Sequence, residues 1–165
     1  MKTYRLHHNL EFDLTRSVPD MAALFAYYPA DEAEVILRVD YNDGRFVASL
    51  EKDGKLWLSA PIICDELVSG EISRCVKLAV LDAFTQMTGQ AVELPWGILT
   101  GVRPGKLAHK LVDSGTGFAL LPNYLQDKYL LPEEQAQLLT NKKKKKKQLV
   151  PDENNEAGIY IGIPF

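Results

Sequence analysis

The residues best suited to chemistry lie in one stretch, Leu94 to Leu107, which holds two prolines, three glycines, a tryptophan and two cations. Arg103 and Lys106 stand at the predicted start of a helix, where free backbone N–H groups and the helix dipole favour an anion. Trp96 is a large apolar anchor, and we expect it to be buried and to hold the loop in place. The pattern is typical either of an anion-binding or docking loop, or of a rigid turn between helices with two solvated cations.

The remaining reactive side chains point to no second site. Cys64 and Cys75 have ten residues between them, which matches no common metal or redox spacing, so we expect reduced, structural cysteines of a cytoplasmic protein. His7 and His8 are adjacent in a predicted strand and therefore face opposite sides of it. His109 falls on the polar side of its predicted helix, where a solvated histidine is expected.

Composition and charge exclude several classes of protein. The 165 residues are 46% hydrophobic and 25% charged, as in a globular domain of ordinary size. No apolar run approaches the ~20 residues of a membrane span, and the first nine residues carry no signal-peptide pattern. Six of the 19 basic residues form the run Lys142 to Lys147, which leaves 13 basic against 22 acidic residues, a net charge of −9, elsewhere. An acidic body with one basic tract argues against a general nucleic-acid-binding surface, which would spread Lys and Arg over one face.

Hydrophobic periodicity predicts an α+β fold in which a small antiparallel β-meander is covered by helices. Two Asp-Gly turns separate alternating apolar runs, which is a strong hairpin signal. Ser17 and Ser69 are the expected N-caps of two helices, and Gly89 is the expected C′ residue that follows the second. The predicted elements are a strand over 3–8, a helix over 18–28, strands over 34–41, 45–51 and 55–60, and helices over 71–88, 104–114, 118–131 and 132–149.

The end of the sequence predicts a domain boundary. Residues 1–150 read as one accessory domain, 151–156 as a polar, acidic linker, and 157–165 as an apolar strand without a partner of its own. Such a strand can join the sheet of its own domain, pair with another copy or stay disordered, and its short linker favours the last two.

Two motifs resemble a known enzyme family. Ile159 to Phe165 is similar to the first barrel strand of radical S-adenosylmethionine (SAM) enzymes of the oxygen-independent coproporphyrinogen oxidase group. Leu94-Pro95-Trp96-Gly97 and Leu99 to Pro104 resemble the region before the barrel in the HemZ-type coproporphyrinogen III oxidase, or dehydrogenase, branch. Gly105 departs from this pattern, in which a threonine is expected.

The resemblance implies an N-terminal accessory domain, cut at the first strand of a radical SAM barrel. The full-length enzyme would use a [4Fe-4S] cluster and SAM to decarboxylate coproporphyrinogen III oxidatively to protoporphyrinogen IX in haem biosynthesis. Tyr160 would contact SAM, and Arg103, Lys106 and Trp96 are the expected substrate or docking residues, since arginine recognises carboxylates well. The expected partners are the barrel of the same chain and the porphyrinogen.

The cluster cysteines of the CxxxCxxC motif are missing from residues 1–165, so this part of the enzyme is expected to bind no cofactor and to be inactive alone. Two alternatives stay open. The chain could be a polyanion- or RNA-binding module that uses Lys142 to Lys147, or its parent could be a radical SAM relative that handles haem itself.

Anaerobic reconstitution of residues 1–165 with iron and sulfide is expected to leave no bound cluster, and the chain is expected to cleave no SAM. The reason is that thiolates at cluster spacing are absent. Iron analysis and the visible spectrum check this, and a brown protein with about four irons per chain would contradict it.

Overall fold

The computed structural model describes the backbone of residues 1–99 and 103–149 and the side chains up to residue 142, apart from 100–102. The predicted linker 151–156 and strand 157–165, with Tyr160, lie outside the described residues, as do the side chains of Lys143 to Lys147. The elements are β1 Lys2–His8, α1 Ser17–Ala22, the 3₁₀ turn η1 Ala23–Phe25, β2 Tyr27–Pro29, β3 Val35–Asn42, β4 Arg45–Lys52, β5 Lys55–Leu58, β6 Ile62–Ile63, α2 Ser69–Thr88, α3 Pro104–Asp113, α4 Leu121–Tyr129 and α5 Glu133–Leu149.

The α+β class is confirmed, but the sheet is larger than the predicted meander and is mixed. Its strands follow the order β2-β1-β3-β4-β5, with β6 paired to β4 as well. The meander β3-β4-β5 is antiparallel as predicted, whereas β1 pairs in parallel with both β2 and β3. These parallel pairs join segments far apart in the sequence, so turn signals could not reveal them.

Both predicted hairpins form with two-residue turns. Asp43 and Gly44 have φ angles of 49° and 77°, and Asp53 and Gly54 have 51° and 72°. Positive φ at both central residues is the geometry that matches the twist of the flanking strands, and Asp-Gly is among the pairs that adopt it most readily. The turns therefore set the register that brings Phe46, Ala48 and Leu50 to the buried face of β4.

The predicted helix over 18–28 is too long, and two predicted caps are wrong. Ala26 adopts a left-handed conformation with φ 61°, which ends the helical segment and starts β2. Ser17 lies inside α1, where its hydroxyl hydrogen-bonds that of Ser73 over 2.7 Å instead of capping the helix. Val68, not Ser69, is the N-cap of α2, while Gly89 ends α2 in the left-handed conformation as predicted.

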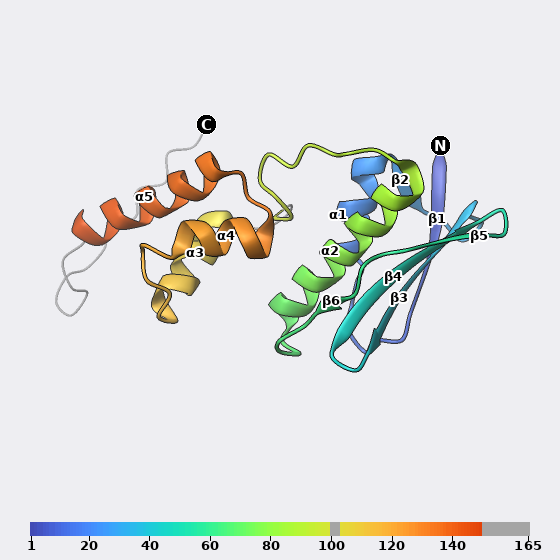
Figure 1. The fold of residues 1–165 in the computed structure, drawn as a ribbon, viewed down its shortest axis with the longest axis horizontal. Helices are drawn as coiled ribbons and strands as arrows, with labels where there is room; N and C mark the ends of the chain where they lie inside the picture. Colours follow the sequence, from blue (N-terminus) through green and yellow to red (C-terminus); the bar gives the residue numbers. More distant parts are fainter. Residues whose placement is uncertain (100–102, 150–165) are drawn as a thin grey trace, which may run out of the picture.

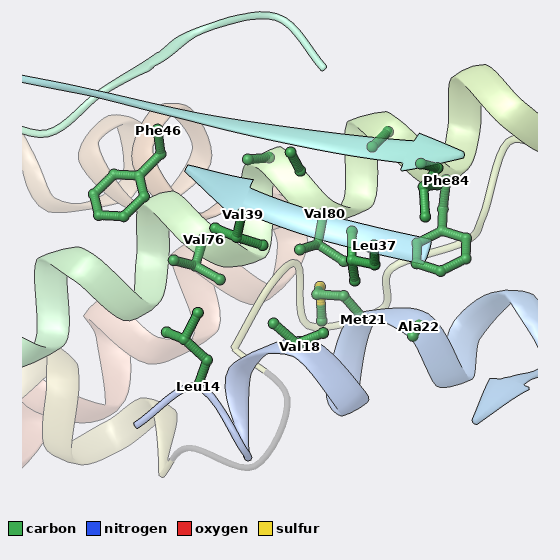
Figure 2. Packing of buried hydrophobic residues seen from close by; sticks show 14 of the residues in the cluster. Leu14, Val18, Met21, Ala22, Leu37, Val39, Phe46, Val76, Val80 and Phe84 are labelled. Atoms are coloured by element: carbon green, nitrogen blue, oxygen red, sulfur yellow. The ribbon is translucent and has the colours of Figure 1, made fainter. Parts of the chain in front are cut away.

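The larger core lies between one face of the sheet and the helices α1 and α2 (Figure 1). Figure 2 shows how Val18 and Met21 of α1 and Val76, Val80 and Phe84 of α2 point toward the side chains of the sheet. The Phe84 ring stacks on Phe25 with 5.3 Å between centroids and meets the rings of Tyr27 at 5.1 Å and Tyr4 at 6.4 Å. Cys75 is fully buried on the same helix, which confirms its structural role.

A second, smaller core lies among α3, α4 and α5. Its buried residues are Leu99, Ala108, Leu121, Leu125, Leu131, Ala136 and Leu139. Figure 1 shows these three helices at the opposite end of the molecule from the sheet, joined to it by the loop that follows α2. Tyr129 is partly buried and packs against both cores.

Phe84→Ala is expected to lower the free energy of unfolding by about 3–5 kcal/mol, because it leaves a cavity where three aromatic rings meet. Leu58→Ala, at a leucine that is 56% exposed on β5, is the control and should change it by less than about 0.5 kcal/mol. Urea denaturation followed by circular dichroism measures both. Equal small effects would mean that the aromatic cluster is not a packed core.

Candidate functional site

The loop between α2 and α3 contributes two consecutive residues, one to each core. Ile98 is 2% exposed and belongs to the core of the sheet, whereas Leu99 is 4% exposed and belongs to the core of α3–α5. Two short turns shape this segment, with the N–H of Gly97 bonded to the carbonyl of Leu94 and that of Leu99 to the carbonyl of Trp96. The loop therefore joins the two parts of the fold through packing as well as through the chain.

Gly97 lets the loop approach the C-terminal end of α4 more closely than any other residue could. Its φ is +56°, and a β-carbon placed there would overlap the carbonyl oxygen of Tyr129 and lie 2.8 Å from the carbonyl of Leu130. The next N–H, that of Ile98, donates to the same Tyr129 carbonyl over 2.9 Å. Both the left-handed backbone and the lack of a side chain are thus required at this position.

Two buried cations of α2 lie beside the loop. Lys77 is 5% exposed, and its Nζ contacts Asp20 of α1 at 3.1 Å and donates to the carbonyl of Ile98 at 3.4 Å. Arg74 is 6% exposed; its Nε donates to Glu71 over 2.8 Å and its Nη1 to the carbonyl of Lys128 over 3.5 Å. Each cation thus ties α2 to the backbone of a neighbouring segment.

Electrostatics favour the charged form of this cluster. The hydrogen bonds that Arg74 donates to Glu71 hold the pKa of Glu71 below its usual value and raise the pKa of Arg74. Burial raises the pKa of Tyr129 and that of the Cys75 thiol each to about 12. At neutral pH Glu71 and Arg74 are therefore an ion pair, and the Cys75 thiol is protonated and a poor nucleophile.

The predicted cations Arg103 and Lys106 are exposed at the start of α3. Arg103 is the N-cap residue, and its carbonyl accepts the N–H of Lys106 over 3.0 Å. Both side chains line a wide, open hollow of about 870 Å³, with Lys110 and the partly buried His109 along the same helix. We call this the α3 hollow. Its lining thus holds three cations and one carboxylate, that of Asp113.

Trp96 is 40% exposed, so the expectation that it is buried is wrong. The turn from Leu94 to Gly97 puts the indole outside, and Ile98 and Leu99 fill the interior instead. Trp96 lines a separate, mostly apolar hollow of about 550 Å³ between the loop, α3 and α5, which we call the loop hollow. Trp96 and Arg103 therefore border neighbouring hollows rather than one site.

Sequence reasoning missed Gly97, Arg74 and Lys77 as the residues that fix the loop. The Gly- and Pro-rich composition signals a special backbone but does not single out the glycine that meets α4. Lys77 and Arg74 lie next to the apolar stripe of α2. Their position in that helical pattern is the feature of the sequence that could have indicated two buried cations. Within the parts of the chain that the structure describes, no three His, Cys, Asp or Glu side chains gather as a metal site would require.

The comparisons with known proteins give one relative of similar sequence. The chain is 39% identical over 93 residues to the "Oxygen-independent coproporphyrinogen-III oxidase-like protein HemZ" of Bacillus subtilis (strain 168). The match covers 54% of this chain and 18% of the relative, so it spans about a fifth of that protein's length. No protein-family model and no solved structure matches the chain. Among the described helices, none is long and apolar enough to cross a membrane.

Gly97→Ala is expected to destabilise the fold by more than about 3 kcal/mol, because the new methyl group would overlap the backbone of α4. Gly89→Ala is the matched control, since Gly89 also has a positive φ, 67°, but no atom lies within 4 Å of its would-be β-carbon. Backbone strain alone should cost the control about 1–2 kcal/mol. Thermal unfolding measures both, and equal losses would show that Gly97 does not touch α4.

Proposed function

We propose that this chain is the N-terminal accessory part of a HemZ-type, oxygen-independent coproporphyrinogen III oxidase-like enzyme. The observation that carries the proposal is the 39% identity to the Bacillus subtilis protein of that name. The two motifs at 94–107 and 159–165 add to it, since they occur in the order that this enzyme family has. The whole enzyme would decarboxylate the propionate side chains of coproporphyrinogen III in haem biosynthesis.

The cysteines of this chain do not fit the iron–sulfur cluster that such an enzyme needs together with SAM. Cys64 and Cys75 are both buried thiols, and their hydrogen atoms point to the carbonyls of Glu66 and Ile63 over 3.2 and 3.5 Å. A [4Fe-4S] cluster requires several thiolates around one space. The proposal therefore assigns the cluster ligands to a part of the enzyme other than residues 1–165, and Tyr160 is the residue of this chain proposed to contact SAM.

The role we assign to this part is to dock on the barrel and to contribute cations to the edge of the substrate cleft. Arg103, Lys106 and Lys110 line one open hollow together with a single carboxylate, Asp113, and the substrate carries four carboxylates. Charged hydrogen bonds to carboxylates are strong, and arginine makes two in parallel. Trp96, exposed on the neighbouring loop hollow, offers a flat apolar surface to the barrel or to the tetrapyrrole.

The natural coding sequence tests the proposal directly. Reading on from Phe165, we expect a cysteine triad with CxxxCxxC spacing within the next ten codons or so, followed by a barrel-sized domain. A stop codon, or a continuation without these cysteines, would overturn the assignment. The complete enzyme, produced anaerobically, should then release carbon dioxide from coproporphyrinogen III when SAM is supplied.

The cations of α3 are expected to bind the carboxylates of the substrate. Coproporphyrin III, the stable oxidised form, serves as the probe, and quenching of tryptophan emission reports its binding to residues 1–165. Arg103→Ala and Lys106→Ala should each weaken binding roughly threefold to tenfold, since these cations are exposed. Lys55→Ala, an exposed lysine at the β4–β5 turn, is the charge-matched control.

The salt dependence of binding distinguishes this proposal from the alternative of RNA binding through Lys142 to Lys147. Binding of RNA by six lysines would fall about a thousandfold between ~50 and ~200 mM salt. Binding of coproporphyrin through two or three cations and apolar contact should fall far less. Tight RNA binding with that steep salt dependence, and no effect of the Arg103 and Lys106 variants on coproporphyrin, would favour the polyanion module instead.

A further inference from the structure

The fold brings together two cysteines between which the sequence places ten residues. Cys64 directly follows β6, and Cys75 lies in the second turn of α2, the helix that packs against β6. The thiol of Cys75 donates to the carbonyl of Ile63, the residue before Cys64, over 3.5 Å. The two thiols also interact with each other, and neither is part of a disulfide. The pair is therefore close in space, although its spacing in the sequence matches no redox motif.

The two thiols differ in how easily a reagent reaches them. Cys64 is 8% exposed, at the edge of the core, whereas Cys75 is 0% exposed. Burial is the main reason why the pKa of Cys75 is raised to about 12, and the Arg74 guanidinium, 3.4 Å from its sulfur, opposes the rise. Because the thiolate is the form that attacks a disulfide, we expect Cys64 to react first and Cys75 to follow slowly.

Contact between two thiols is close to the arrangement that a disulfide needs. The bond joins two sulfur atoms about 2.05 Å apart and requires side chains that point toward each other. Cys75 is held in a helix of 20 residues, whereas Cys64 lies in the irregular segment 64–68 between β6 and α2. The adjustment that brings the sulfur atoms to bonding distance therefore falls on the segment that carries Cys64.

We propose that Cys64 and Cys75 form a reversible disulfide when the chain meets a small-molecule disulfide such as oxidised glutathione. The Cys64 thiolate attacks one sulfur of the oxidant, whose S–S bond breaks and releases one glutathione. Cys75 then gives up its proton and attacks the Cys64 sulfur, which releases the second glutathione. The two protein thiols lose two electrons and two protons, and the oxidant takes up both to become two glutathione thiols.

This disulfide would lie at the junction between the two cores. Asp65, the residue after Cys64, pairs with Lys128 of α4 at 3.0 Å. Arg74, the residue before Cys75, donates to the Lys128 carbonyl over 3.5 Å. The disulfide closes the segment that carries both contacts, so oxidation is placed to act on the way α2 meets α4. The proposal does not depend on the enzyme function proposed above.

Peptide mapping after oxidation tests the proposal. Native residues 1–165 are equilibrated with mixtures of reduced and oxidised glutathione, quenched with acid, alkylated and digested with trypsin. Trypsin cleaves after Lys55, Arg74 and Lys77. Cys64 and Cys75 therefore fall on separate peptides, and the disulfide appears as one linked pair. Because the fold holds the thiols together, the native chain should form this pair at a level of oxidised glutathione about tenfold lower than the chain in concentrated urea.

Two variants separate the steps of the reaction. Cys75→Ala should stop at the mixed disulfide, with one glutathione bound to Cys64. Cys64→Ser should take up none, because Cys75 is buried. Equal uptake of glutathione by the two variants would contradict the assigned order of attack.

Three results with the unmodified chain would overturn the proposal. A reaction that stops at the mixed disulfide would show that Cys75 cannot reach Cys64. A linked pair that forms no more readily in the native chain than in urea would show that the fold does not bring the sulfur atoms together. Linked peptides found only in a covalent dimer would show that the bond joins two copies of the chain instead.

Discussion

The contact between the backbone of Gly97 and Ile98 and the Tyr129 carbonyl at the end of α4 is the constraint on which the rest depends. It brings an extended loop against a helix end at a distance that only a glycine permits, and it satisfies a carbonyl that the helix leaves without an internal partner. Because Ile98 and Leu99 then enter different cores, the same contact joins the sheet part to α3–α5.

The buried cations of α2 support this junction from the other side. Lys77 donates a hydrogen bond to the carbonyl of Ile98, and Arg74 donates one to the carbonyl of Lys128 near the end of α4. Burial of a charge is costly unless it is paired, and here Asp20 and Glu71 supply the counter-charges. With its interior fixed in this way, the loop presents its outward residues, Trp96 and Arg103, to two adjacent open hollows. The functional proposals rest on those outward residues.

Local signals were enough to predict much of the fold. The Asp-Gly turns define the hairpins, and the long apolar stripe and Gly89 define α2. The parallel pairing of β1 with β2 and β3 was not predictable, because it joins segments without a local turn. The helix over 18–28 was overextended for the same reason, since β2 forms through its pairing with β1 rather than through a local propensity.

The candidate site was predictable as a region but not in its detail. The density of Gly, Pro and Trp marks the loop after α2, and Arg103 and Lys106 lie at the start of α3 as predicted. Trp96 was expected inside because it is the largest apolar residue there. Which residues of such a loop turn inward is decided by a contact with α4 some thirty residues later, which no local pattern encodes. The same contact explains why Gly97, among three glycines, is the critical one.

Hydrogen exchange at the Ile98 amide tests this account most directly. This N–H donates to the Tyr129 carbonyl, and the residue is buried, so its exchange should be slowed nearly as much as that of buried amides in α2 such as Val80. Measured by NMR in the native state, that result would support a loop locked between the two cores. Exchange of the Ile98 amide at the rate of an exposed loop amide would contradict it.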